Sequence, residues 1–348
     1  MVRLRQTTAS LLALGTLSIY CALAASAFAQ PAAPFAGKTI EVLVGHDAGG
    51  GYDLYTRVMT RHMAHHIAGN PSIVVKNMPG AGGLRLAGHL ANGAAKDGTS
   101  FGLFDRGGVI EPLLGNPGAR FDGSKLTTIG SIGKQVATCA AWHESPVTTI
   151  QQALVNEMLV GGTGPSATTT YPTLLNAVLK TKFKIIAGYK GSGQILLAME
   201  QGEVQGVCLS WPTLKAAKPD WTRDKKLIPL VQISFASHPD LAGVPLMGDI
   251  AKSDADRKML AFFFAPNEFG RPYFGPPEIP AERLQILRRA FDATMADKAF
   301  LTEADKAQME IEPITGEEMQ KLIADIYATP KELVDQVAVA MAPFREKQ

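Results

Sequence analysis

Four glycine-rich segments carry the most evident chemistry in this sequence. Each follows a run typical of a strand and precedes a run typical of a helix. Glycine lets backbone N–H groups turn toward a ligand, and a helix N-terminus adds partial positive charge. If several such loops face one cleft, they can hold an anion without any lysine or arginine. The four segments span residues 45–53, 77–83, 161–168 and 189–193.

Two other patterns could do chemistry of a different kind. Ser166 stands between a strand and a helix, where a nucleophile could lie, but residues 164–168 lack the second glycine of a nucleophile elbow. We interpret Ser166 as a helix cap that also contacts ligand, with a secreted α/β hydrolase as the alternative. His62, His65 and His66 lie close in the sequence, but Met63 occupies the position of the zinc-protease glutamate. We therefore expect a solvated helix face and no metal.

The elements that must position these loops alternate between strand and helix. Residues 39–44 predict a strand, and the helix that follows it carries Tyr55, Met59, Met63 and Ile67 on one face. The short apolar run 259–265 predicts a buried strand. This alternation predicts α/β architecture with mostly parallel sheets, in which ligands bind beyond the carboxyl ends of the strands. No linker stands out, which favours two lobes joined by crossing strands.

Composition excludes several classes of function. The chain has 348 residues, of which 46% are hydrophobic and 19% are charged, an ordinary globular balance. Its 34 basic and 32 acidic residues give a net charge of +2. Arg3 and Arg5 lie in a segment we expect to be removed, which leaves a formally neutral protein. Neutrality gives no electrostatic basis for binding nucleic acid or an anionic membrane.

The first 29 residues resemble a secretory signal peptide. Arg3 and Arg5 precede an apolar stretch over residues 11–25, and Ala27 and Ala29 are the small residues that a signal peptidase recognises. We expect cleavage before Gln30 and export of the remaining chain. The apolar stretch falls short of the roughly 20 residues that span a bilayer, so a retained anchor is the weaker interpretation.

Two cysteines remain after this cleavage. Cys139 and Cys208 each lie in a short strand-like run. In an oxidising compartment they either form a disulfide, if the strands are neighbours, or stay as two separate buried thiols. The sequence leaves both alternatives open, because it does not reveal the distance between their Cα atoms.

A resemblance to a known family rests on the joint order and spacing of several short motifs. Gly-Gly-Gly-x-Asp with Arg57 after it, and Asn-x-Pro-Gly-Ala-Gly-Gly at residues 77–83, are similar to the periplasmic receptors of tripartite tricarboxylate transporters. The similarity covers residues 36–345. The remaining motifs stand at residues 97–98, 130–133, 189–192, 202–204 and 274–284.

The resemblance implies a fold and a function. The fold is a two-lobed, flytrap-like periplasmic-binding-protein fold of type II-like form, with residues 36–132 and 236–348 in one lobe and 133–235 in the other. The implied function is a monomeric periplasmic receptor, without cofactor or catalysis, that closes on a small organic acid. It would deliver this carboxylate to the permease subunits of a tripartite transporter, or alternatively report it to a sensor protein.

Ligand contacts carried over by position come from loops of both lobes. Tyr189 could bind ligand or simply pack, and we favour ligand because Gly191 and Ser192 adjoin it. Trp211 follows a strand and stays a cleft candidate beside the core interpretation. With Asp47 and Trp211 added from the residues themselves, the candidates are Asp47, Ala48, Gly49, Gly50, Gly51, Gly80, Ala81, Gly82, Gly83, Asp105, Arg106, Gly107, Thr163, Gly164, Ser166, Tyr189, Gly191, Ser192 and Trp211.

Asp47 and the pair Asp105-Arg106 depart from the family pattern. A carboxylate about 4 Å from Asp47 would be repelled by ~4 kcal/mol at an effective dielectric constant of 20. A helix N-terminus returns only about 0.3–1 kcal/mol. Asp47 therefore points away, is neutralised by Arg106, or meets a donor on the ligand. We favour the last two together, which predicts a ligand with an anionic and a hydrogen-donating end, such as a hydroxy, amino or aromatic acid.

Overall fold

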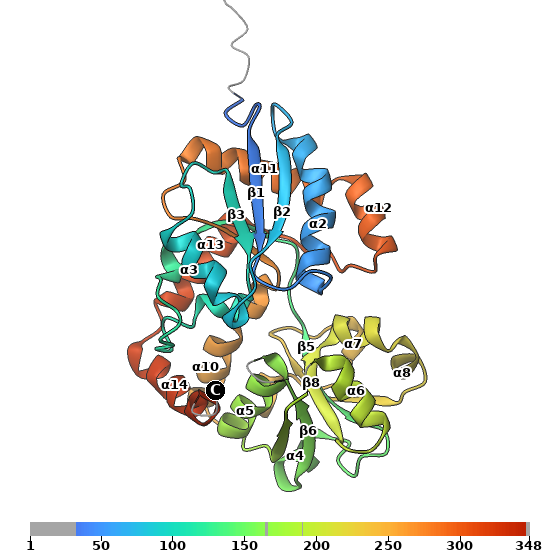
Figure 1. The fold of residues 1–348 in the computed structure, drawn as a ribbon. Coiled ribbons are helices and arrows are strands. Elements are labelled where there is room, and N and C mark those ends of the chain that lie inside the picture. Colours follow the sequence, from blue (N-terminus) through green and yellow to red (C-terminus); the bar gives the residue numbers. More distant parts are fainter. Residues whose placement is uncertain (1–32, 164–165, 190, 346–348) are drawn as a thin grey trace, which may run out of the picture.

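Two lobes, each built around its own sheet, make up the computed structural model (Figure 1). It describes residues 33–163, 166–189 and 191–345. The expected signal peptide, residues 1–29, and the candidate Gly164 lie outside these residues. None of the described helices is long and apolar enough to cross a bilayer.

The first lobe contains a six-stranded mixed sheet in the order β11-β4-β10-β3-β1-β2. Strands β1, β2 and β3 are parallel, so the loops that follow them share one edge of the sheet. Strand β10 runs antiparallel to β3 and β4, because the chain returns from the other lobe through it. The strands are β1 Thr39–Val44, β2 Ser72–Asn77, β3 Ser100–Leu103, β4 Thr127–Ser131, β10 Pro272–Gly275 and β11 Ile314–Thr315.

Helices cover both faces of this sheet. In β1, Ile40 and Val42 face one apolar layer with α2 and α11, whereas Leu43 faces the opposite layer with α3 and α13, as the two-residue period of a strand requires. His62 and His66 pair with Glu303 and Asp297 beside α12, rather than forming only a solvated face. The helices are α2 Gly51–Met63, η1 Ala64–His66, η2 Ala81–Gly83, α3 Leu84–Asn92, η3 Arg106–Val109, η4 Gly123–Lys125, α11 Ala281–Met295, α12 Lys298–Lys306 and α13 Gly316–Tyr327.

The second lobe is a five-stranded mixed sheet in the order β7-β6-β8-β5-β9. Helix α5 packs on one face, and α6, α7 and α8 form an apolar layer on the other. The elements are β5 Ala137–Trp142, β6 Met158–Gly162, β7 Phe183–Ala187, β8 Gly206–Ser210, β9 Leu227–Ile233, α4 Ile150–Val155, α5 Ala167–Leu179, α6 Ser192–Glu200, α7 Trp211–Ala217 and α8 Pro219–Arg223.

A disulfide joins Cys139 of β5 to Cys208 of β8. The two residues stand directly opposite each other in the antiparallel ladder, with Cα atoms 3.9 Å apart. Of the two alternatives that the sequence leaves open, the structure has the disulfide. It lies in the core of the second lobe, since both residues are buried.

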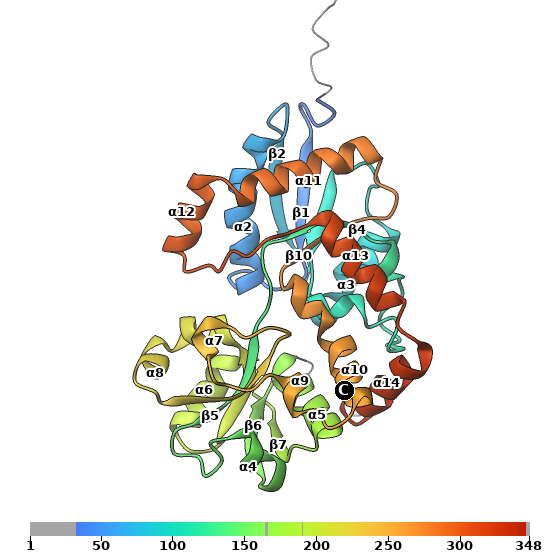
Figure 2. The ribbon, with the colours of Figure 1, turned by 180° about the vertical axis from the view of Figure 1, so that it is seen from behind.

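The chain crosses between the lobes twice. Residues 132–136 connect β4 to β5, and the return passes through η5 Pro239–Leu241, α9 Met247–Ile250, α10 Asp254–Phe264 and η6 Ala265–Phe269. The two crossings meet where Gln135 N–H donates to the Asn267 carbonyl at 2.7 Å. Helix α10 and the C-terminal helix α14, Lys331–Arg345, both pack against α5 of the second lobe (Figures 1 and 2).

The predicted strand at residues 259–265 is wrong, because these residues end α10 and begin η6. Seven apolar residues fit a buried strand and a buried helix equally well, so their length and composition did not decide. The helix signal lies upstream, where the Ser253 side chain accepts from Asp256 N–H and acidic residues fill the first turn.

Candidate ligand-binding site between the lobes

A cavity of about 270 Å³ lies between the lobes, close to the second crossing. Its walls come from η2, η3 and the segment after η3 in the first lobe, from the start of α5 in the second, and from α10, η6 and α14. The polar or backbone positions on it include Gly82, Asp105, Arg106, Ser166 and Asn267. The cavity therefore touches both lobes and the chain segment that joins them.

Arg106 is the central cation of this cavity. It is 9% exposed, and its guanidinium reaches three elements. Nε donates to Asn267 Oδ1 at 2.7 Å, Nη1 donates to the Tyr52 hydroxyl at 3.2 Å, and Nη2 donates to the Tyr171 hydroxyl. Tyr52 belongs to the first lobe, Tyr171 to the second and Asn267 to the crossing. One buried side chain thus links all three.

The local backbone explains why Arg106 points inward. Asp105 caps η3 by accepting from Gly107 N–H at 2.8 Å, and its other oxygen accepts from the Tyr52 hydroxyl at 3.3 Å. This fixes the short turn that starts with Arg106. Burial lowers the pKa of the Arg106 guanidinium, but the neighbouring Tyr171, Tyr52 and Asp105 outweigh burial and raise the pKa above its ordinary value. The side chain is therefore a permanent buried cation.

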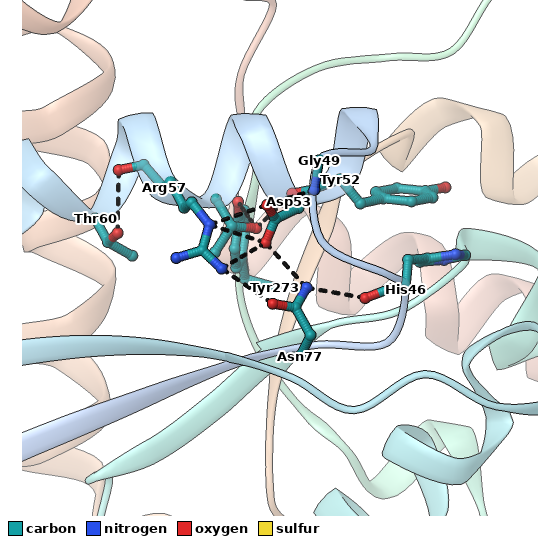
Figure 3. Close-up of polar contacts among 9 residues, drawn as sticks. His46, Gly49, Tyr52, Asp53, Arg57, Thr60, Asn77 and Tyr273 are labelled. Atoms are coloured by element: carbon teal, nitrogen blue, oxygen red, sulfur yellow. Dashed lines mark hydrogen bonds and ion pairs between the residues drawn. The ribbon is translucent and has the colours of Figure 1, made fainter.

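Asp53 clamps the first two glycine loops together (Figure 3). Its carboxylate accepts from Gly49 N–H at 2.9 Å, from Arg57 Nε at 2.9 Å and from Asn77 Nδ2 at 2.9 Å. Asn77 Nδ2 also donates to the His46 carbonyl at 2.9 Å. The hydrogen bond from Arg57 is the main reason that the pKa of Asp53 falls to about 2. Asp53 is thus an internal anion that already occupies a donor of the first loop.

The loops that follow β1, β2 and β3 meet at a close backbone contact. A Cβ on Gly45 would lie 3.1 Å from the Gly83 Cα, and a Cβ on Gly83 would lie 2.9 Å from the Phe104 Cβ. Gly83 also has a φ of +92°, which side chains rarely adopt. Glycine at these positions allows the three loops to gather at the sheet edge.

A small hydroxyl cluster forms the second-lobe loop. Ser166 Oγ lies 2.7 Å from Thr163 Oγ1 and 2.8 Å from Thr168 Oγ1, and Thr163 N–H donates to Thr168 Oγ1 at 3.0 Å. Ser166 is the N-cap residue, directly before α5, but its side chain bonds these hydroxyls instead of the helix N–H groups. Among the described residues, no histidine or carboxylate hydrogen-bonds to Ser166. Within the described part of the chain, Ser166 thus has no hydrogen bond to a base of the kind that the hydrolase alternative requires.

The structure brings only part of the candidate set to the cavity. Its lining includes Ala81, Gly82, Asp105, Arg106, Gly107 and Ser166. The first loop, residues 47–51, and Gly80 are solvent-exposed and outside the lining. The buried Gly83 and the half-buried Thr163, Gly191 and Ser192 also lie outside it. Tyr189 donates to Glu203 at 3.4 Å, and Trp211 is buried in the second-lobe core with its indole N–H on Asp240.

Sequence reasoning missed three residues that hold Arg106. Tyr171 lies on the apolar face of α5 with Leu174 and Leu175, a pattern typical of a core residue, although its hydroxyl reaches Arg106. Tyr52 adjoins the three glycines, and that position was the available signal. Asn267 follows the mispredicted segment and carries no sequence signal, because it reaches the site only through the second crossing.

The structure has the two-lobed periplasmic-binding-protein fold that the resemblance implied. Each lobe contains a mixed sheet flanked by helices, and the chain crosses between the lobes twice. No protein-family model and no curated protein matches the chain. Its structure is similar to that of a TctC solute-binding protein from Polaromonas without ligand, at 19% identity and a TM-score of 0.65, over 86% of this chain and 99% of that one.

Two further similar structures come from Rhodopseudomonas palustris. MatC with bound malate shares 19% identity at a TM-score of 0.61, over 86% of this chain and 99% of that chain. A second protein, with adipate, shares 17% identity at a TM-score of 0.62, over 86% and 97% of the two chains. At these identities the likeness shows a shared fold.

Proposed function

We propose that this protein is a periplasmic receptor that captures a small organic acid between its lobes and delivers it to the permease subunits of a tripartite transporter. The observation that carries the proposal is a cavity between two lobes that holds a buried cation, Arg106, bonded to side chains from both. A ligand that contacts both lobes favours the closed arrangement through its differential contacts.

Three further observations support this function. The fold is that of solute-binding proteins, and two similar structures hold the dicarboxylates malate and adipate. The lining of the cavity combines loops at the carboxyl ends of parallel strands with the start of α5, where ligands of open α/β sheets bind. The N-terminal sequence is typical of an exported protein, cleaved before Gln30.

We assign residues 36–132 and 236–348 to the first lobe and residues 133–235 to the second. Under this division the hinge lies at the two crossings, where Gln135 and Asn267 are hydrogen-bonded through their backbones. Helices α10 and α14 extend from the first-lobe chain onto α5. They make up part of the cavity wall through Phe263, Phe264 and Met341.

A thermal-shift screen of small organic acids on the chain beginning at Gln30 tests the function. A ligand at 100 times its dissociation constant adds about 2.7 kcal/mol to the free energy of unfolding, so a genuine ligand raises Tm clearly. Each acid is paired with its uncharged amide as a control. We expect at least one acid to raise Tm while its amide does not. If no acid raises Tm more than its amide, the receptor function is wrong.

A further inference from the structure

The charged side chains that line the cavity are one guanidinium, that of Arg106, and the carboxylates of Asp105 and Glu111. Among the described residues that line the cavity, Arg106 is the single basic one, and its three hydrogen-bond partners are uncharged oxygens. In the described part of the chain, no carboxylate oxygen lies within 4.0 Å of its guanidinium. Asp105 acts on Arg106 from further away, but its oxygens already accept from Gly107 N–H and the Tyr52 hydroxyl. A buried guanidinium with neutral partners suits an incoming carboxylate.

Asn267 provides an unused donor beside this cation. The residue is 4% exposed and lines the same cavity. Because Arg106 Nε can only donate, the amide atom 2.7 Å from it is the oxygen, which identifies the other atom as Nδ2. Nδ2 is buried and has no hydrogen-bond partner within the residues described. A guanidinium and an amide N–H₂ therefore line one cavity. The amide N–H₂ still requires an acceptor, and the three hydrogen bonds of Arg106 leave two of the five guanidinium N–H groups for a ligand.

The rest of the wall is largely apolar. The apolar lining residues come from α3, α10, α14 and the segment after η3, and they are Leu84, Ile110, Leu114, Phe263, Phe264 and Met341. Glu111 adds a second carboxylate to the lining, whereas the lining residues that the structure describes include no second cation. A ligand with two carboxylates would leave one of them against apolar or acidic surface, which is costly for a buried charge.

We propose that Arg106 and Asn267 anchor one carboxylate of an amphipathic monocarboxylic acid, whose apolar body fills the cavity between η3, α10 and α14. This deepens the proposed receptor function and rests on it. The chemistry differs from recognition by backbone amides of the glycine loops, since the first loop is exposed and its Gly49 N–H already bonds Asp53. Side chains therefore select the ligand: Arg106 and Asn267 bind its carboxylate, and the apolar wall of the cavity contacts the rest of the molecule.

Three probes with the same six-carbon chain test the proposal by titration calorimetry on the chain beginning at Gln30. Hexanoate has one carboxylate and an apolar end, adipate has a carboxylate at both ends, and hexanamide has none. We expect hexanoate to bind at least about tenfold tighter than adipate and hexanamide to bind more weakly still. Adipate binding as tightly as hexanoate would overturn the proposal, even with the receptor function intact.

Single substitutions test whether hexanoate binds at Arg106 and Asn267. Arg106→Gln should weaken hexanoate about 10- to 100-fold, because a charge-assisted hydrogen bond is lost, whereas the exposed Arg289→Gln should leave it unchanged. Asn267→Asp keeps the acceptor for Arg106 Nε but replaces the donor by a negative charge, so it should abolish hexanoate binding while the protein stays folded. Unchanged binding in Asn267→Asp would refute the anchor. If no organic acid binds the wild-type protein, the receptor function itself fails.

Discussion

The carboxylate of Asp53 accepts a hydrogen bond from the first glycine loop, as the carboxylate of a bound ligand would. Its carboxylate takes the Gly49 N–H and the Asn77 amide, and Arg57 balances its charge. The loop that seems best suited to bind a carboxylate is thus held by a carboxylate of the chain itself. The charge left for a ligand is Arg106, whose partners are neutral. Glycine content alone therefore did not locate the anion-binding donors.

The low pKa of Asp53 predicts a pH-dependent stability. Since the pKa falls to about 2 in the folded protein, the ionised carboxylate stabilises the fold above its ordinary pKa, and this contribution is lost as pH falls from about 4 to about 2. We expect Asp53→Asn to lower the free energy of unfolding by about 1–2 kcal/mol at pH 7, and by roughly half as much at pH 3. Urea unfolding at both pH values measures this.

Asp325→Asn, an exposed carboxylate of α13, is the matched control and should change stability little at either pH. If Asp53→Asn lowers stability equally at pH 7 and pH 3, the clamp does not depend on the ionised form and the interpretation of Asp53 fails.

The loops after β1, β2 and β3 act as one element at the sheet edge. Gly45, Gly83 and Phe104 come into close contact there, and Asp105 follows at once to begin the turn of Arg106. The position of the buried cation therefore depends on how closely the loop after β2 approaches the loop after β3. A single methyl group at Gly83 would push them apart.

A pair of glycine substitutions separates this contact from general helix effects. Gly83→Ala should destabilise the protein by about 1–3 kcal/mol, because its Cβ would lie 2.9 Å from the Phe104 Cβ at a φ of +92°. Gly88→Ala, inside α3 with open space around it, should stabilise by about 0.5–1 kcal/mol. Thermal unfolding of both variants measures the difference, and equal Tm values would rule out the close contact.

At the scale of the whole molecule, Arg106 joins the lobes at the side of the hinge. Its guanidinium donates to Tyr171 of the second lobe, to Tyr52 of the first lobe and to Asn267 of the second crossing. Helices α10 and α14 continue this connection by packing on α5. A ligand bound to Arg106 thus contacts the group that both lobes share, which couples binding to lobe closure.

Lobe closure is measurable by small-angle X-ray scattering. Saturating the protein with the acid that raises Tm most should decrease the radius of gyration, because that ligand favours the closed arrangement. Tyr171→Phe removes the hydroxyl through which the second lobe reaches Arg106, and we expect a larger radius of gyration in its ligand-free form. Identical scattering with and without saturating ligand would contradict a closing receptor.

Much of the fold was predictable from the sequence, because local patterns carry it. Strand-like runs followed by glycine loops and amphipathic helices indicate α/β architecture wherever they occur, and the stripe through Tyr55 and Met63 is buried as expected. The prediction failed at residues 259–265, where seven apolar residues fit a strand or a helix and only the capping Ser253 upstream decided.

The candidate site was predictable in its loops but not in its chemistry. Arg106 and Ser166 follow or adjoin strand ends, so their position relative to the sheet edge can be inferred from sequence order. Only the tertiary structure decides which hydrogen-bond donors remain available to a ligand. Asp53 accepts from Gly49 and Asn77 of the first two loops. Tyr171 and Asn267 reach Arg106 from segments distant in the sequence. Local propensity acts over a few residues, whereas a buried charge is satisfied only by what folding brings beside it.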